Sequence, residues 1–245
     1  MNFVLSHAED FFVRLEADGY IDGKIVVKDN ETDQKYSLYK HTESVYALSI
    51  TMYDIYPVIF SAGYDKLVCI WKFGKSGWKC VFTLQTEKPI INMATSHRKE
   101  LALVFKDGTI STYTFTDTSI AFKQTYNISN ATAVTYHPME CNLICSTKDG
   151  KIIDLDKNST TQISTAKINF IAFGDSSLAA ICDDSTVKVV ADSVVQNIPI
   201  TLNEKPTRLK WTPMTNQLAV YGKNSSEVWN TVDGSTWRRV NNKII

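Results

Sequence analysis

The chain has 245 residues, of which 44% are hydrophobic and 21% are charged, and its 26 basic residues balance 26 acidic ones. A chain of this length can bury a hydrophobic core without disulfides or metals. Because phosphate binding normally requires a clustered basic excess, the zero net charge argues against a nucleic-acid partner.

The first ten residues, MNFVLSHAED, hold only a short apolar run ahead of His7. We therefore expect no signal peptide and no direct membrane insertion, and we expect a cytosolic or nuclear protein. The cysteines lie mostly in apolar alternating segments, which is typical of buried, reduced thiols. They are Cys69, Cys80, Cys141, Cys145 and Cys182. Cys141 and Cys145 lack a second ligand pair, so no metal site is predicted.

One short pattern recurs along the chain: a turn residue, usually Asp, followed by alternating apolar residues. In chain order the copies are DGKIVVKD from Asp22, DKLVCIWK from Asp65, DGTISTYTF from Asp107, DGKIIDLD from Asp149 and DSTVKVVAD from Asp184. A sixth copy, KNSSEVWN from Lys223, is placed by aligning Trp229 with Trp71. The copies are spaced about forty residues apart, the period of a β-propeller blade.

Further alternating runs precede each later copy, for example VYALSI and VIFSAG before Asp65. Each unit therefore contains three or four short strands, and helical periodicity is nowhere sustained. Asp-Gly pairs at 22/23, 107/108 and 149/150 supply the positive φ that tight hairpins need. The sequence predicts an all-β, six-bladed β-propeller. It forms one domain over residues 1–245, with blades ending near residues 35, 85, 125, 160, 200 and 243.

The stretch YSLYKHTESVYALSI followed by VIFSAGYDKLVCIWK resembles a WD repeat. His41 stands at the position of the family's Gly-His pair, although Lys40 replaces the glycine, and Trp71 stands where a blade closes. The resemblance implies that His41 pairs with the turn residue Asp65, in a structural role.

The chain also resembles the Sec-thirteen family, the small WD-repeat subunit shared by the COPII outer coat and the Y-shaped nuclear pore scaffold. The resemblance is carried by HTESVYALSITMYDIYPVIFSAGYDKLVCIWK, ELALVFKDGTISTYTF, RLKWTPMTNQLAVYGKNSSEVWN and DGSTW. It covers residues 37–115 and 207–240. It implies a scaffold role in ER-to-Golgi transport, at ER-derived vesicle coats in the cytoplasm, and a second role at the nuclear pore.

In the resembled family the propeller is open, and a partner inserts a β-blade that completes it. The implied partner is a large coat subunit of the Sec-thirty-one type or a nucleoporin, in a heteromeric assembly. We expect its contacts to come from the first and last blades, at Phe3, Leu5, Ile25, Val27, Leu218, Val220 and Val228. The alternative is that these are core positions of a closed ring.

No catalytic constellation emerges from the sequence. GKS at 74–76 lacks the earlier glycine of a phosphate-binding loop, and the four histidines are far apart. We therefore expect a protein that is not an enzyme and needs no cofactor. Two other functions stay open: a Seh-type nucleoporin paralogue, and a closed WD-repeat adaptor that binds peptide segments. The short connection from Trp71 to Trp78 favours the coat subunit over the paralogue.

Overall fold

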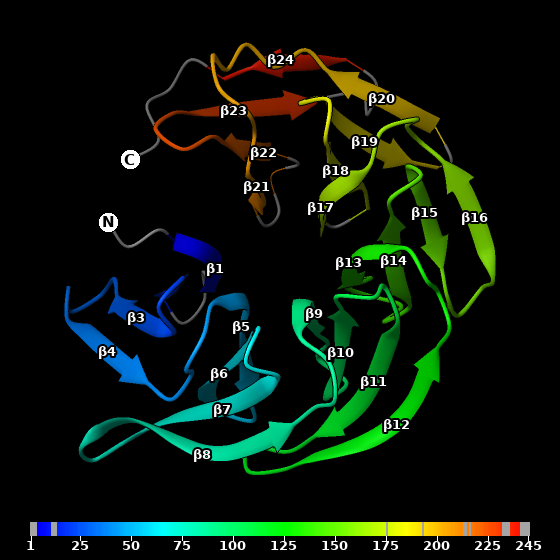
Figure 1. Cartoon of the computed structure of the whole chain (residues 1–245). Helices are drawn as coiled ribbons and strands as arrows, with labels where there is room; N and C mark the ends of the chain where they lie inside the picture. The colour runs from blue at the N-terminus through cyan, green and yellow to red at the C-terminus, as the bar shows by residue number, and fades with distance from the viewer. Residues whose placement is uncertain are drawn as a thin grey trace. The chain divides into compact units, whose positions relative to one another are not determined.

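The computed structural model describes residues 4–10, 14–174, 176–192, 194–212, 215, 217–231 and 236–240. Within these ranges 24 strands form six antiparallel four-stranded sheets, and there is no helix (Figure 1). Each sheet is one blade, so the predicted fold class, an all-β six-bladed propeller, is confirmed. The described residues accordingly contain no helix long and apolar enough to span a membrane.

The chain divides into two compact units, Met1–Ser129 and Asn130–Ile245. The first unit holds three blades. Blade 1 contains β1 (Val4–Asp10), β2 (Leu15–Tyr20), β3 (Lys24–Asp29) and β4 (Lys35–Tyr39). Blade 2 contains β5 (Val45–Tyr53), β6 (Tyr56–Gly63), β7 (Leu67–Gly74) and β8 (Gly77–Gln85). Blade 3 contains β9 (Ile90–Thr95), β10 (Glu100–Phe105), β11 (Ile110–Phe115) and β12 (Ile120–Tyr126).

The second unit also holds three blades. Blade 4 contains β13 (Ala131–Tyr136), β14 (Leu143–Thr147), β15 (Lys151–Asp154) and β16 (Ser159–Gln162). Blade 5 contains β17 (Ile168–Phe173), β18 (Leu178–Cys182), β19 (Val187–Ala191) and β20 (Val194–Ile198). Blade 6 contains β21 (Arg208–Thr212), β22 (Gln217–Tyr221), β23 (Ser226–Thr231) and β24 (Trp237–Arg239). In all six blades the four strands pair in chain order, so that the first and the fourth strand are the edges of the sheet.

The recurring Asp builds the hairpin between the second and third strands of a blade. In four blades its carboxylate accepts a hydrogen bond from the backbone N–H two residues later: Asp22 from Lys24, Asp65 from Leu67, Asp107 from Thr109, and Asp184 from Thr186. The residue after the Asp has positive φ in five blades, namely Gly23, Lys66, Gly108, Gly150 and Ser185. Glycine takes this conformation without steric cost, which explains the Asp-Gly pairs.

The middle blade of each unit is covered on both faces. In β6, Val58 and Phe60 pack in the cluster shared with blade 3, whereas Ile59 between them packs in the cluster shared with blade 1. In β18, Ala180 packs toward blade 4 and Ile181 toward blade 6. These strands are therefore apolar over most of their length, because neither face meets water.

Blade 1 differs from the middle blades. Along β2, buried and half-buried residues alternate, and the buried ones, Leu15 and Ala17, pack against blade 2. The intervening Glu16, Asp18 and Tyr20 lie on the opposite face. The second face of blade 1 is thus polar.

Candidate functional site

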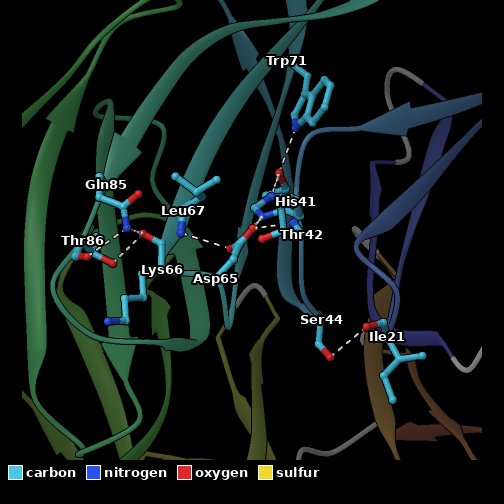
Figure 2. A network of polar contacts seen from close by, with 11 residues as sticks. Ile21, His41, Thr42, Ser44, Asp65, Lys66, Leu67, Trp71, Gln85 and Thr86 are labelled. Atoms are coloured by element: carbon cyan, nitrogen blue, oxygen red, sulfur yellow. Dashed lines mark hydrogen bonds and ion pairs between the residues drawn. The ribbon is translucent and has the colours of Figure 1, made fainter.

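A buried polar network links the entrance of blade 2 to its second and third strands (Figure 2). His41 Nδ1 lies 2.9 Å from Asp65 Oδ2, and His41 Nε2 lies 2.8 Å from the Ser61 hydroxyl. Trp71 Nε1–H donates to the same hydroxyl oxygen at 2.8 Å. The His41–Asp65 contact is the one that the resemblance implies. The four side chains form one continuous hydrogen-bonded chain, called the blade 2 network below.

The Asp65 carboxylate is deeply buried, with its side chain 4% exposed. Burial alone raises the pKa of Asp65, but the His41 hydrogen bond and charge, with the backbone N–H groups of Thr42 and Leu67, lower it overall. The two N–H groups donate at 3.0 and 3.1 Å. A buried carboxylate is tolerated when donors satisfy it in this way.

The proton positions follow from the ionised carboxylate. His41 Nδ1 carries a hydrogen and donates it to Asp65. His41 Nε2 and the Ser61 hydroxyl share a hydrogen bond, and the Ser61 oxygen also accepts from the Trp71 indole N–H. Every polar atom of the network that faces the core therefore has a partner.

The order Asp65, His41, Ser61 is that of a catalytic triad. The Ser61 side chain, however, lies in a fully buried residue, and its oxygen is already engaged by the Trp71 indole. A nucleophile must reach its substrate, so this arrangement stabilises the blade and does not perform acyl transfer.

The backbone at Gly63 lies close to Ser44 and Asp65, and only a residue without a side chain fits there. A Cβ atom added to Gly63 would lie 2.7 Å from the Ser44 carbonyl oxygen and 3.0 Å from Asp65 Oδ1. The Ser44 hydroxyl also donates to the Ile21 carbonyl at 3.1 Å, which ties blade 2 to the turn of blade 1 (Figure 2).

The structure separates the residues predicted to contact a partner into two groups. Leu5 on β1 is 37% exposed, and Val228 is half-buried on the face of β23 that points away from blade 5. These two positions suit a partner contact. Phe3 lies outside the described residues.

The remaining predicted contacts are core residues. Ile25 and Val27 are 0% exposed and pack against blade 2, and Leu218 and Val220 are 0% exposed and pack against blade 5. The correction has a physical reason. Period-2 alternation identifies the apolar face of a strand but not the neighbour that this face meets.

Comparison with known proteins bears on the blade 2 network. Residues 32–72 match the WD40 family, described as WD domain, G-beta repeat. This range contains His41, Ser61, Asp65 and Trp71. Residues 32–72 are therefore similar to a WD repeat, and the term is used for them below.

The fold around the WD repeat has a relative among solved structures. The crystal structure of the Cps50 (Swd1) β-propeller domain from Myceliophteria thermophila matches with a TM-score of 0.77 and 15% sequence identity. The match covers 98% of this chain and 86% of that chain. At this identity the likeness concerns the fold. The comparison with curated protein sequences gave no match.

Sequence reasoning missed Ser61, the central hydroxyl of the WD repeat. A detectable signal exists, because Ser61 is the one polar residue in the apolar run Val58–Ala62 of a central strand. Buried polar side chains are nearly always hydrogen-bonded. A lone serine in such a run therefore indicates a buried network.

Glu227 in blade 6 was missed as well. Its residue is 3% exposed, and its carboxylate accepts from the Thr201 N–H at 3.0 Å and from the Trp229 indole at 3.2 Å. The Thr201 hydroxyl also donates to it, and Arg239 Nη1 lies 3.4 Å away. The indole N–H of Trp229, the residue aligned with Trp71, thus donates to a carboxylate, whereas that of Trp71 donates to a serine hydroxyl.

In blade 6 a glutamate takes the role of the turn Asp, whose position is occupied by Lys223. Glu204, from the segment before β21, accepts from the Asn224 N–H at 2.8 Å and the Ser225 hydroxyl at 2.5 Å. A carboxylate from a neighbouring segment therefore holds the hairpin at which Lys223 departs from the repeat pattern.

The described residues contain no group of three or more His, Cys, Asp or Glu side chains placed to hold a metal ion. Cys141 and Cys145 are both buried, and neither forms a disulfide.

Proposed function

We propose that this WD-repeat propeller is a non-catalytic scaffold subunit of the Sec-thirteen type, acting in the COPII outer coat and in the Y-shaped nuclear pore scaffold. Its partner is an elongated helical subunit that donates a β-blade. The Sec-thirteen resemblance described above supports the specific assignment, and the WD-repeat propeller is a fold suited to scaffolding. A Seh-type nucleoporin is the neighbouring alternative.

One structural observation carries the proposal: the second face of blade 1 is polar. The middle blades show that a blade packed on both sides by blades of its own unit presents apolar residues on both faces. The corresponding face of blade 1 carries Tyr20, Lys24, Val26 and Lys28, which no other blade of the first unit covers. A face of mixed polarity is typical of a protein interface rather than of a domain core.

The partner contacts are revised accordingly. In blade 1 they move from Ile25 and Val27 to the intervening Val26, which is half-buried on the second face. In blade 6, Val228 is retained on the face opposite Leu218. Val26 shares its face with Lys24 and Lys28, and Val228 shares its face with Ala219 and Lys210.

Co-expression tests the proposal. The full chain is produced with the Sec-thirty-one type subunit of the same organism and, separately, with the blade-donating nucleoporin, and the complex mass is measured by light scattering. We expect a stable one-to-one pair with at least one partner. Val26→Lys and Val228→Asp should each weaken the pair at least tenfold, because each buries a charge at the contact, and Lys24 and Lys28 flank position 26 with like charge.

Val81→Glu is the matched control, since Val81 is 41% exposed on the outer strand of blade 2. It should leave binding unchanged. Absence of binding to either partner, or equal effects of all three substitutions, would overturn the proposal.

A specific surface feature favours a second candidate, the peptide-binding adaptor. Tyr46 is 38% exposed, its ring lies 6.1 Å from that of Tyr64, and Lys106 Nζ lies 4.7 Å from the Tyr64 ring centroid. Aromatic side chains beside a cation fit an acidic peptide that carries an apolar residue. If this is the function, an array of acidic peptides should give ligands that Tyr46→Ala and Lys106→Glu abolish and Val81→Glu does not.

A further inference from the structure

Two cysteines of blade 2 lie on neighbouring strands and face the same cluster. Cys69 is in β7 and is 0% exposed, whereas Cys80 is in β8 and is half-buried. Both pack in the cluster that contains Leu38 and Trp71. The described residues hold no disulfide at these positions, and both thiols are free.

The strand register places the two cysteines close together on adjacent strands. Cys80 is paired with Trp71, two residues after Cys69, and the register shifts between Ile70 and Trp71. Cys80 is therefore a diagonal neighbour of Cys69 across the strand pair, and both side chains pack in the same cluster. The side chains of Cys69 and Cys80 share a hydrogen bond.

The surroundings give the two thiols different chemistry. The hydrogen bond from Cys69, the Lys40 charge and the Phe82 backbone contact lower the pKa of Cys80 to about 7, although partial burial opposes them. The hydrogen bond to Cys80, burial and the Asp65 charge raise the pKa of Cys69. Cys80 is thus the more acidic thiol of the pair.

Four other residues lie close to the two cysteines. Ser61 contacts Cys69 and belongs to the WD repeat network, Tyr36 of β4 packs on the same cluster, and Cys80 Sγ lies 3.3 Å from the Phe82 carbonyl oxygen. Lys40 is the cation whose charge acts on Cys80.

We propose that Cys69 and Cys80 form an oxidation site in which Cys80 reacts with hydrogen peroxide and Cys69 then closes a disulfide within blade 2. The Cys80 thiolate attacks one peroxide oxygen, an S–O bond forms, the O–O bond breaks and hydroxide leaves. The Cys69 sulfur next attacks the Cys80 sulfenic acid, and the displaced hydroxyl takes the Cys69 proton and leaves as water. The two sulfurs together lose two electrons, which reduce the peroxide.

This site is independent of the proposed scaffold function, because both cysteines lie inside a single blade. Disulfide formation removes the Cys69 S–H that lies beside Ser61, so oxidation alters the surroundings of the blade 2 network. Oxidation therefore acts on the stability of blade 2.

Peptide mapping of the whole protein tests the site. After mild peroxide treatment and alkylation, trypsin cuts after Lys66, Lys72 and Lys79, so that Cys69 and Cys80 lie on separate peptides. We expect a linked pair of peptides 67–72 and 80–98 that separates on reduction. We also expect the alkylation rate of Cys80 in the untreated protein to reach half its maximum near pH 7, because the pKa of Cys80 is lowered to about 7.

Three variants make the outcome decisive. Cys69→Ser should trap the sulfenic acid at Cys80, detected as a dimedone adduct, and Cys80→Ser should abolish both products. Cys145→Ser is the control, because burial raises the pKa of Cys145 to about 12, and it should leave the linked peptides unchanged. Native protein that gives sulfinic acid at Cys80 without linked peptides, or that reacts first at another cysteine, would overturn the proposal even if a variant fails to fold.

Discussion

At the scale of single residues, two buried carboxylates hold the two indoles that close blades 2 and 6. Asp65 acts through His41 and Ser61, whereas Glu227 accepts directly from Trp229. Both solutions obey the same rule, since a buried charge is stable only when several donors surround it. The sequence revealed the first acid through the WD-repeat resemblance and gave no pattern for the second.

Ser61→Ala should destabilise the protein by about 2 kcal/mol, because the Trp71 N–H loses its acceptor and His41 Nε2 loses its partner inside the core. Chemical unfolding at neutral pH measures the change. Ser119→Ala is the matched control, since the Ser119 hydroxyl is exposed and contacts only Thr116. Equal effects of the two substitutions would contradict the role assigned to the network.

Glu227→Gln should lower the stability at pH 7 by about 2 kcal/mol, because an amide cannot accept from all the donors that meet the carboxylate. Burial raises the pKa of Glu227, but the Thr201 hydrogen bonds, Arg239 and Trp229 lower it overall. A lowered pKa in the folded state stabilises the protein above the pKa of the unfolded state, and this contribution is lost as the pH falls through the folded value. The difference between wild type and variant should therefore shrink below about pH 4. A difference that stays constant with pH would exclude the ionised carboxylate as its cause.

At the scale of elements, the turn after the second strand of each blade decides what the sequence could predict. The Asp-Gly pairs fixed the repeat, and the structure shows positive φ at the same position even where Lys66 or Ser185 replaces glycine. The strands and their period were therefore predictable from local chemistry. The sequence could not predict which neighbour each apolar face contacts. Ile25 and Leu218 pack against blades that only the tertiary structure specifies.

Gly150→Ala should destabilise blade 4 by more than about 2 kcal/mol, because φ is +81° and the new Cβ would lie 2.0 Å from the Ser164 carbonyl oxygen. Hydrogen exchange at the amides of Ile163 and Ser164, which both donate to the Gly150 carbonyl, should become faster. Gly74→Ala is the control, since its nearest contact is the Gly77 oxygen at 3.9 Å, and it should change stability little. Unchanged exchange in Gly150→Ala would show that the turn relaxes.

At the scale of the whole molecule, the recurring hairpin brings with it, in several blades, an aspartate whose pKa is lowered. Lysine contacts, supported by nearby hydroxyl and backbone groups, lower the pKa of Asp107 and Asp149 to about 2, and Thr186 lowers that of Asp184. The partner contacts in blades 1 and 6 stay a prediction. The structure shows only that Ile25 and Leu218 pack against neighbouring blades, whereas Val26 and Val228 lie on the opposite faces.

The stability of the chain should fall progressively from about pH 4 to pH 2, as these lowered carboxylates become protonated and their contribution disappears. Urea unfolding across this range measures the slope. Asp107→Asn and Asp149→Asn should each flatten it. Salt at about 1 M should also flatten it, because Lys88 and Lys151 pair with these acids at exposed sites. A slope that neither substitution alters would assign acid sensitivity to other groups.

The positions of the five tryptophans have a practical consequence. Trp71 and Trp78 belong to the first compact unit, and Trp211, Trp229 and Trp237 belong to the second. Each half of the chain thus carries its own intrinsic fluorophores, and replacing the indoles of one half by phenylalanine leaves emission from the other alone. Such a pair of variants can reveal, without any attached dye, whether the two halves melt together or one after the other.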